Sequence, residues 1–117
     1  MITITLGRAS SGYIQKFTIS GHSGYAKDGP DIICAAISVL GQTAIGALQE
    51  LAILTVDYQI LETKGYLECT TPAPEDMASG QYQIANTIMD MFELGCRQVS
   101  LSYGKKYIRM ISSSFIE

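Results

Sequence analysis

The stretch from Ile32 to Gln49 contains no charged residue, and it restricts the possible fold more than any other part of the chain. A run of this length is almost enough to cross a membrane as a helix, which needs about 20 apolar residues. Because the run also includes Ser38 and Gln42, we expect a buried helix of a soluble protein and no membrane segment. The apolar face of this helix is expected to consist of Ile33, Ile37, Leu40, Ala44, Ala47, Leu48 and Leu51. With Asp31 as the N-cap, the pattern predicts a helix from about Ile32 to Leu51.

The composition indicates one domain. The chain has 117 residues, of which 47% are hydrophobic and 16% are charged, compared with about 25% charged residues in an average soluble domain. We therefore expect a single domain over residues 1–117 and no intrinsic disorder. The net charge is −3 and there is no basic block, so direct binding of nucleic acid is not expected.

The cysteines favour a reducing compartment. Cys34, Cys69 and Cys96 are odd in number and widely spaced, which does not suit a disulfide framework. The residues after Met1 alternate at once between apolar and polar types, so no signal peptide is predicted and we expect a cytoplasmic protein. The single histidine and the three cysteines include no close pair of zinc ligands, so neither a metal nor another cofactor is predicted.

Alternation of apolar and polar residues predicts two β-hairpins and a final strand. The first hairpin turns at residues 7–12, which include glycine and serine, and the second turns at Glu62–Gly65. The expected strands are Ile2–Leu6, Tyr13–Ile19, Val56–Ile60, Leu67–Cys69 and Lys106–Met110.

A second long helix is predicted after the proline-containing linker at residues 71–74. Its apolar stripe is expected to contain Met77, Ile84, Ile88, Met91 and Phe92. The segment Val99–Tyr103 fits both an extension of this helix and a separate strand, so the element order is ββαββα(β)β. We expect an α+β fold in which a small antiparallel or mixed sheet of about five strands packs against two long helices.

The residues with the clearest chemical potential are His22 and Cys34. His22 lies on a glycine-rich loop, and Cys34 lies in the first turn of the predicted helix. Free N–H groups and the helix dipole stabilise a thiolate at that position, and a nearby imidazole can act as its base. The same N–H groups could bind the oxyanion of an acyl-transfer intermediate. The pair is therefore a candidate nucleophile and general base.

Two neighbouring residues could assist this pair. Ser38 follows Cys34 by one helical turn, and Asp31 precedes the helix, so either could orient the imidazole as the third member of a triad does. Asp31 could instead serve only as a helix cap. In the competing interpretation Cys34 is a core packing residue and His22 a solvated loop residue, as is common for these residue types. The position of Cys34 at a helix N-terminus favours the catalytic interpretation.

Other catalytic motifs fit less well. The segment Gly21–Tyr25 departs from the G-x-S-x-G elbow of serine hydrolases because Tyr25 takes the place of the final glycine. The segment Tyr103–Lys106 lacks the leading glycine and the following Ser or Thr of a phosphate-binding loop.

The segment from Gly21 to Ser38 resembles the ribosomal-processing cysteine proteases of Firmicutes and their relatives. Members of that family carry a Gly-His pair and a D-I-[VI]-C-A-A-x-S block. This chain contains Gly21-His22 and Asp31-Ile32-Ile33-Cys34-Ala35-Ala36-Ile37-Ser38. The layout of hairpins, helices and terminal strand is similar over essentially the whole chain. The chain departs from the family pattern at Pro30, where a charged or polar residue is frequent, and after Gly95.

The resemblance implies a cysteine endopeptidase that removes a short N-terminal extension from a large-subunit ribosomal protein. Cys34 would be its nucleophile and His22 its general base and acid. The mobile loop would contain Gly21, Gly24, Tyr25, Gly29 and Pro30. Its closure over an apolar peptide would gate the site. The acidic net charge suits a basic ribosomal-protein partner.

A homodimer is expected on two grounds. The resemblance implies one, and a helix that is uncharged over most of its circumference needs more cover than one sheet provides. The alternative function is a catalytically silent, dimeric, ribosome-associated binding module in which Cys34 only packs.

Overall fold

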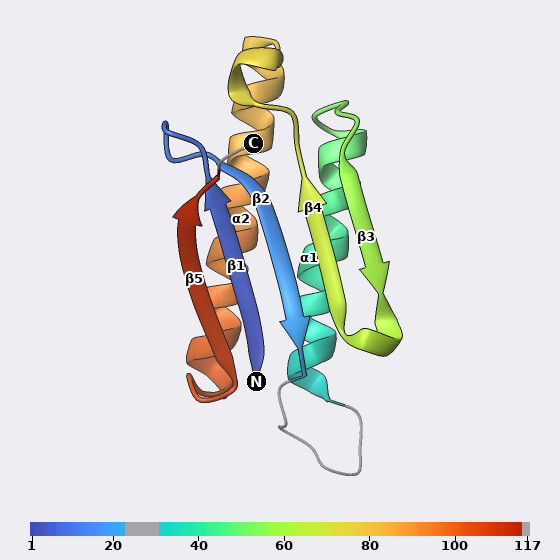
Figure 1. Ribbon diagram of the computed structural model, residues 1–117, viewed down its shortest axis with the longest axis vertical. Helices are drawn as coiled ribbons and strands as arrows, with labels where there is room; N and C mark the ends of the chain where they lie inside the picture. The colour runs from blue at the N-terminus through green and yellow to red at the C-terminus, as the bar shows by residue number, and fades with distance from the viewer. Residues whose placement is uncertain (23–30, 116–117) are drawn as a thin grey trace.

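A computed structural model describes residues 1–22 and 31–115 of the chain. In the described ranges, two long helices lie on one face of a five-stranded sheet (Figure 1). The elements are β1 (Ile2–Arg8), β2 (Ile14–Gly21), α1 (Ile32–Glu50), β3 (Asp57–Leu61), β4 (Tyr66–Thr70), α2 (Ser79–Tyr103) and β5 (Ile108–Ser114). Short 3-10 turns cover Glu62–Lys64 and Pro74–Asp76. The predicted α+β class and element order are confirmed, without a separate strand before β5.

The sheet is mixed, with the strand order β3-β4-β2-β1-β5. Neighbouring strands are antiparallel except for β1 and β5, which run parallel with Ile2 opposite Ile108. β5 starts and ends later than the predicted Lys106–Met110, because Lys106 lies in the turn after α2. Ile108 is the first residue of β5, and it is buried beside Ile2. The serines at the end of β5 pair with β1 although they have no apolar pattern.

α1 begins where the sequence predicts, after the N-cap Asp31. Its buried residues are Ile33, Ile37, Gly41, Ala44, Ile45 and Leu48. Leu51, expected on this face, follows the helix end and is 64% exposed. Gly41 allows a close approach to the sheet, because a Cβ there would lie 2.7 Å from Cδ1 of Ile19. By length and composition α1 could cross a membrane, and 33% of its most apolar stretch is buried in this structure.

α2 settles the ambiguity at Val99–Tyr103, which is helical. The helix ends at Gly104, whose φ of 111° favours glycine. Its buried residues are Ala85, Ile88, Met89, Phe92 and Cys96. The predicted stripe was wrong at Ile84 and Met91, which are 42% and 52% exposed. α2 therefore has two adjoining apolar stripes, and the one that contains Met89 and Phe92 is buried.

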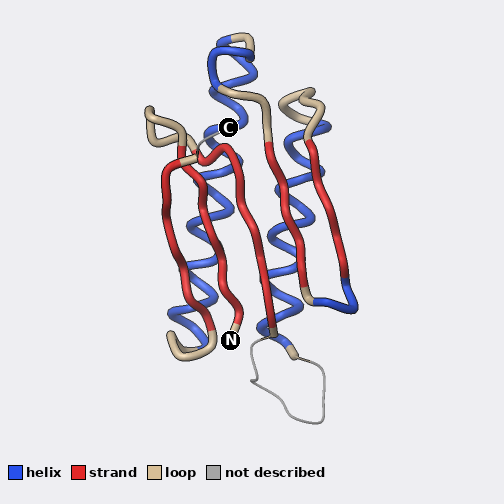
Figure 2. The backbone as a smooth tube through the Cα atoms, in the orientation of Figure 1, coloured by secondary structure: helices blue, strands red, loops and turns tan. Residues whose placement is uncertain are grey.

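The core lies between the sheet and the helices. In the view of Figure 1, α2 lies behind the β5-β1-β2 side and α1 behind the β4-β3 side. Phe17 of β2 stacks on Phe92 of α2 with ring centroids 4.2 Å apart. No helix covers the opposite face of the sheet in Figures 1 and 2. The side chains of β1, β2 and β4 on that face are mostly polar, including Thr3, Thr5, Lys16, Thr18, Glu68 and Thr70. The alternation of buried and partly exposed residues in these strands fits a sheet covered on one face.

Candidate active site

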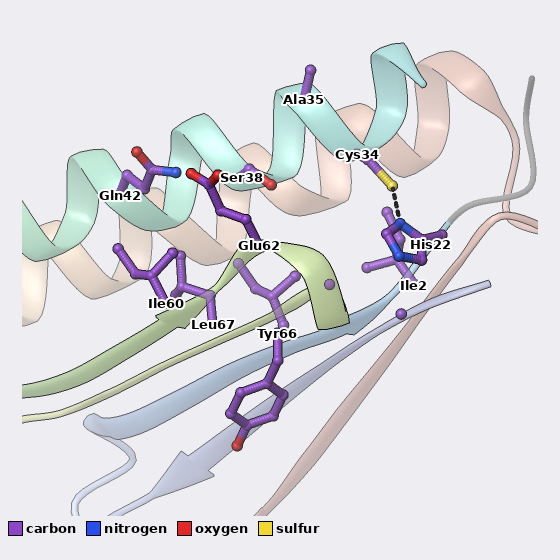
Figure 3. A pocket seen from close by; sticks show the side chains of 13 residues that line it. Ile2, His22, Cys34, Ala35, Ser38, Gln42, Ile60, Glu62, Tyr66 and Leu67 are labelled. Carbon is purple, nitrogen blue, oxygen red and sulfur yellow. Dashed lines mark hydrogen bonds between the residues drawn. The ribbon is translucent and has the colours of Figure 1, made fainter. Parts of the chain in front are cut away.

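His22 and Cys34 meet at the lower end of the molecule in Figure 1, where β2 ends and α1 begins. His22 directly follows β2, and Cys34 lies in the first turn of α1. The Sγ atom of Cys34 is 3.9 Å from Nδ1 of His22 (Figure 3). The imidazole is exposed and the thiol is half-buried. The structure therefore brings the two sequence-predicted residues together on neighbouring elements.

The carboxylate of Asp31 makes two kinds of contact at the start of α1. Its Oδ1 atom accepts hydrogen bonds from the N–H groups of Ile33 and Cys34, each at 3.1 Å. Its Oδ2 atom accepts a hydrogen bond from the thiol of Cys34 at 3.0 Å. The predicted cap is confirmed, and the carboxylate also holds the thiol. In this geometry the proton of Cys34 points toward Asp31.

The cap restricts the expected oxyanion site. The N–H groups of Ile33 and Cys34 already donate to Asp31, and that of Ala35 donates to the Asp31 carbonyl at 3.0 Å. These groups cannot bind an oxyanion while the cap bonds stay in place. The positive end of the α1 dipole still lies at this point.

The backbone before His22 is tightly held. Gly21, expected in the mobile loop, is instead the last residue of β2, opposite Ile2. Its N–H donates to the carbonyl of Gly65 at 2.8 Å, and its φ is 94°. A Cβ at Gly21 would lie 2.5 Å from the carbonyl oxygen of Met1, so glycine is required there. The main-chain nitrogen of Met1 donates to the carbonyl of His22.

The other residues expected in the mobile loop are not placed. Gly24, Tyr25, Gly29 and Pro30 lie outside the described residues. Ser38, the other residue predicted to orient His22, lies one turn after Cys34, and both residues line one pocket (Figure 3).

A pocket of about 240 Å³ adjoins the His22–Cys34 pair. Its residues come from α1, the sheet and the β3–β4 hairpin (Figure 3). The apolar lining residues include Ile2, Ile19, Ile60 and Leu67, and the polar ones include Ser38, Gln42 and Glu62. The pocket can accept an apolar side chain with a polar group at its rim.

The sequence did not reveal the part played by the β3–β4 hairpin. The pattern predicts Ile60 and Leu67 as strand residues and Glu62 and Gly65 as turn residues. Their position around the pocket of His22 and Cys34 depends on pairing between β2 and β4. Gly65, at the predicted turn, is the sequence feature that points to a close approach of this hairpin to another part of the chain.

The other two thiols lie in the core. Cys69 and Cys96 are fully buried, and burial raises the pKa of each to about 12. Their thiols therefore stay protonated at neutral pH and are poor nucleophiles. Within residues 1–22 and 31–115, no group of three or more His, Cys, Asp or Glu side chains is arranged to hold a metal ion.

The sequence profile of the family described as cysteine protease Prp matches residues 1–109. The chain belongs to this family. The resemblance noted in the sequence is thereby confirmed, and the protein is a cysteine protease by family. No curated protein sequence matches the chain.

Solved structures share the fold over almost the whole chain. The ribosomal processing protease Prp from S. aureus with a covalently linked product peptide has a TM-score of 0.81 at 19% identity, over 97% of this chain and 100% of that chain. The same protease with a substrate peptide has a TM-score of 0.78 at 18% identity, with 97% and 100% covered. SMU.848 from Streptococcus mutans has a TM-score of 0.75 at 25% identity, over 97% of this chain and 96% of that chain.

Proposed function

We propose that this protein is an endopeptidase that removes a short N-terminal extension from a large-subunit ribosomal protein. Cys34 is the nucleophile and His22 the general base and acid. The observation that carries the proposal is the His22–Cys34 pair at the end of an apolar pocket. Membership of the Prp family and the S. aureus relative, a ribosomal processing protease seen with substrate and product peptides, support the choice of substrate.

The reaction begins by moving the thiol proton from Cys34 to His22. The 3.9 Å between Sγ and Nδ1 exceeds a normal hydrogen bond, and the thiol instead donates to Asp31 at 3.0 Å. Catalytic contacts are often long before substrate binds. Rotation of the thiol hydrogen and a small approach of the exposed ring bring Nδ1 into position to take the proton.

The thiolate then attacks the scissile carbonyl and forms a C–S bond. The positive end of α1 stabilises the oxyanion. As the C–N bond breaks, the His22 imidazolium gives its proton to the leaving amine, and a thioester remains on Cys34. His22 then takes a proton from water, and the resulting hydroxide attacks the thioester carbonyl. The C–S bond breaks, the acyl group leaves as a carboxylic acid that ionises in water, and the Cys34 thiolate takes back the proton from the His22 imidazolium.

The substrate proposal agrees with the pocket next to the thiol. Ile19, Ile60 and Leu67 provide an apolar lining close to Cys34. An apolar or aromatic side chain near the cleaved bond would bury its surface there, at about 25 cal/mol per Å². Such contacts hold the peptide so that its carbonyl faces Sγ.

The test is cleavage of a peptide that copies the N-terminus of the ribosomal protein. Cys34→Ala should abolish cleavage and His22→Ala should reduce it by at least about a hundredfold, in line with the loss of a positioned general base. Cys96→Ala is the matched control, because it removes a buried thiol on α2 and should keep the activity. Cleavage by the Cys34→Ala variant would disprove the nucleophile assignment.

The catalytically silent binding module is the weaker proposal. That function requires Cys34 to be a packing residue of the core. The Cys34 thiol is instead half-buried, and it lies beside the exposed imidazole of His22. The thiol also lines an open pocket.

We further propose that the protein is a cytoplasmic homodimer. The three free cysteines suit a reducing compartment. On the side of the helices away from the sheet, a groove is lined by Ile32, Ala36, Val39, Leu40, Val99 and Tyr103. Val39 is 62% exposed and Ile32 is 44% exposed. A second copy covering this groove would bury the remaining apolar surface of α1.

Sedimentation at micromolar concentration tests the dimer. The native chain should sediment as a dimer, and Val39→Asp should give a folded monomer. Thr18→Asp, on the polar face of the sheet, should leave the dimer intact. A monomeric native chain would refute this proposal.

A further inference from the structure

The turn between β3 and β4 touches the ring of His22. Gly65 ends this turn with a φ of 60°, a left-handed conformation that favours glycine. A Cβ on Gly65 would lie 2.8 Å from Nε2 and 2.9 Å from Cε1 of His22. Optimal contacts between such atoms are about 3.5–4.0 Å, so the ring occupies space that any side chain at this position would need.

Gly65 and Cys34 approach different atoms of the His22 ring. Gly65 faces the Nε2–Cε1 edge, and the thiol of Cys34 faces Nδ1. Because His22 is exposed, its ring can rotate away from a new side chain without disturbing the core. The same Cβ would also lie 3.0 Å from the carbonyl oxygen of Gly21, so a substitution at Gly65 would change the distance between Nδ1 and Sγ and would also strain the β3–β4 turn.

We propose that Gly65 is a positioning residue for His22. Its missing side chain lets the imidazole rest against the β3–β4 turn, from where a small movement brings Nδ1 within reach of the Cys34 thiol. This inference rests on the proposed function, because it takes His22 as the base that serves Cys34. The hydrogen bond from the Gly21 N–H to the Gly65 carbonyl, at 2.8 Å, fixes the turn to the backbone next to His22.

Two substitutions separate the contact from the strain of a positive φ. Asparagine tolerates the left-handed conformation better than most residues, so Gly65→Asn should fold, but its Cβ still meets the imidazole. Gly12 is the matched control: it lies in the β1–β2 turn with a φ of 92°, and a Cβ there would meet nothing within 4 Å. Gly12→Asn therefore alters a positive-φ turn and leaves the site untouched.

Steady-state cleavage of the substrate peptide gives the first readout. Gly65→Asn and Gly65→Ala should lower kcat roughly tenfold or more, because small displacements of a catalytic group are costly. KM should change by less than about threefold, because the ring is displaced while most of the pocket is kept. Gly12→Asn should keep both constants. Wild-type kcat in Gly65→Asn, or an equal loss in Gly12→Asn, would overturn the inference.

A second readout does not depend on turnover. His22 is the only histidine, so the proton on its Cε1 gives one assignable NMR resonance. In Gly65→Asn this resonance should move away from its wild-type position, and alkylation of Cys34 at neutral pH should slow several-fold. Gly12→Asn should match the wild type in both. A wild-type resonance and alkylation rate in a folded Gly65→Asn protein would refute the positioning role.

The two proposals fail in different ways. If Cys34→Ala still cleaves the peptide, the nucleophile assignment is wrong, yet the ring resonance still reports whether Gly65 sets the position of His22. If only the Gly65 variants behave as wild type, the proposed function stands and the positioning role is refuted. Circular dichroism of each variant confirms that the folded protein is being compared.

Discussion

Replacing Asp31 tests its two contacts separately, because one carboxylate oxygen caps α1 and the other accepts the thiol hydrogen bond. Asp31→Ala removes both contacts. Asp31→Asn keeps a side-chain oxygen for the cap and removes the negative charge next to Cys34. The two variants should therefore differ in stability and share the loss of charge.

The stability effect follows from the two N–H groups held by Oδ1. Loss of an N-cap costs about 1 kcal/mol, within a range of about 0.5–2, and asparagine caps about as well as aspartate. Asp31→Ala should thus lower the free energy of unfolding by about 1–2 kcal/mol, or roughly 4–8 °C in Tm for a domain of this size. Asp31→Asn should stay within a few tenths of a kcal/mol of the wild type.

The reactivity effect follows from the 3.0 Å between Oδ2 and Sγ. At this distance a thiolate would be repelled by the carboxylate by about 1.4 kcal/mol in water and about 5.5 kcal/mol at an effective dielectric constant of about 20. Cys34 is half-buried, so the repulsion lies between these limits. One kcal/mol corresponds to a factor of about five. Asp31→Asn should therefore raise the rate of Cys34 alkylation at neutral pH roughly fivefold or more.

The assay combines urea unfolding with timed alkylation by iodoacetamide, followed by mass spectrometry of the Cys34 peptide. Asp90→Asn is the control for net charge, because Asp90 is exposed on α2. It should change neither quantity. Slower alkylation in Asp31→Asn, or equal destabilisation by Asn and Ala, would show that the carboxylate does not act as the hydrogen bonds indicate.

The other predictions concern the thiols, the core and the helical glycines. Cys34 should be alkylated well before Cys69 and Cys96, because burial raises the pKa of each of these two thiols to about 12. The two buried thiols ionise more easily in the unfolded chain, so the free energy of unfolding should fall as the pH rises from about 9 to 12, which urea unfolding at several pH values would show. Phe92→Ala should cost about 3–5 kcal/mol in urea unfolding, because it removes a fully packed ring. Gly46→Ala should raise stability by about 0.5–1 kcal/mol, since a Cβ there meets nothing within 4 Å. Gly95→Ala should instead destabilise, since its Cβ would lie 2.8 Å from Cδ2 of Leu40, and thermal melts of the pair would distinguish the two.

Local signals predicted much of the fold. The start of α1 followed from Asp31 and the uncharged run after it, and both hairpins followed from alternation and turn residues. The predicted buried face of α2 was wrong at Met91. Two apolar stripes lie next to each other on this helix, and the packing of the whole fold determines which one is buried. The parallel pairing of β5 with β1 could not be derived, because nothing near Ile108 specifies a distant partner.

The candidate site was predictable only where its residues lie close in sequence. His22, Asp31 and Cys34 belong to one short segment, so a single sequence motif predicts all three. Gly65 and Glu62 reach the same place through the register of β4 against β2, which the sequence pattern did not fix. The hydrogen bond from the Cys34 thiol to Oδ2 of Asp31 also needed coordinates, because it depends on the rotamers of both side chains.

The parallel pairing of β1 with β5 has a consequence for the order of folding. Ile2 pairs with Ile108, so the contact must close a loop that contains every other element. Such contacts pay a large loop-closure entropy and slow folding. The corner that holds His22 and Cys34, by contrast, joins β2, α1 and β4 over shorter separations in the sequence. We expect this corner to form before β5 docks, so that the edge of β1 is until then unpaired and open to association with other chains. Docking of β5 would end that exposure.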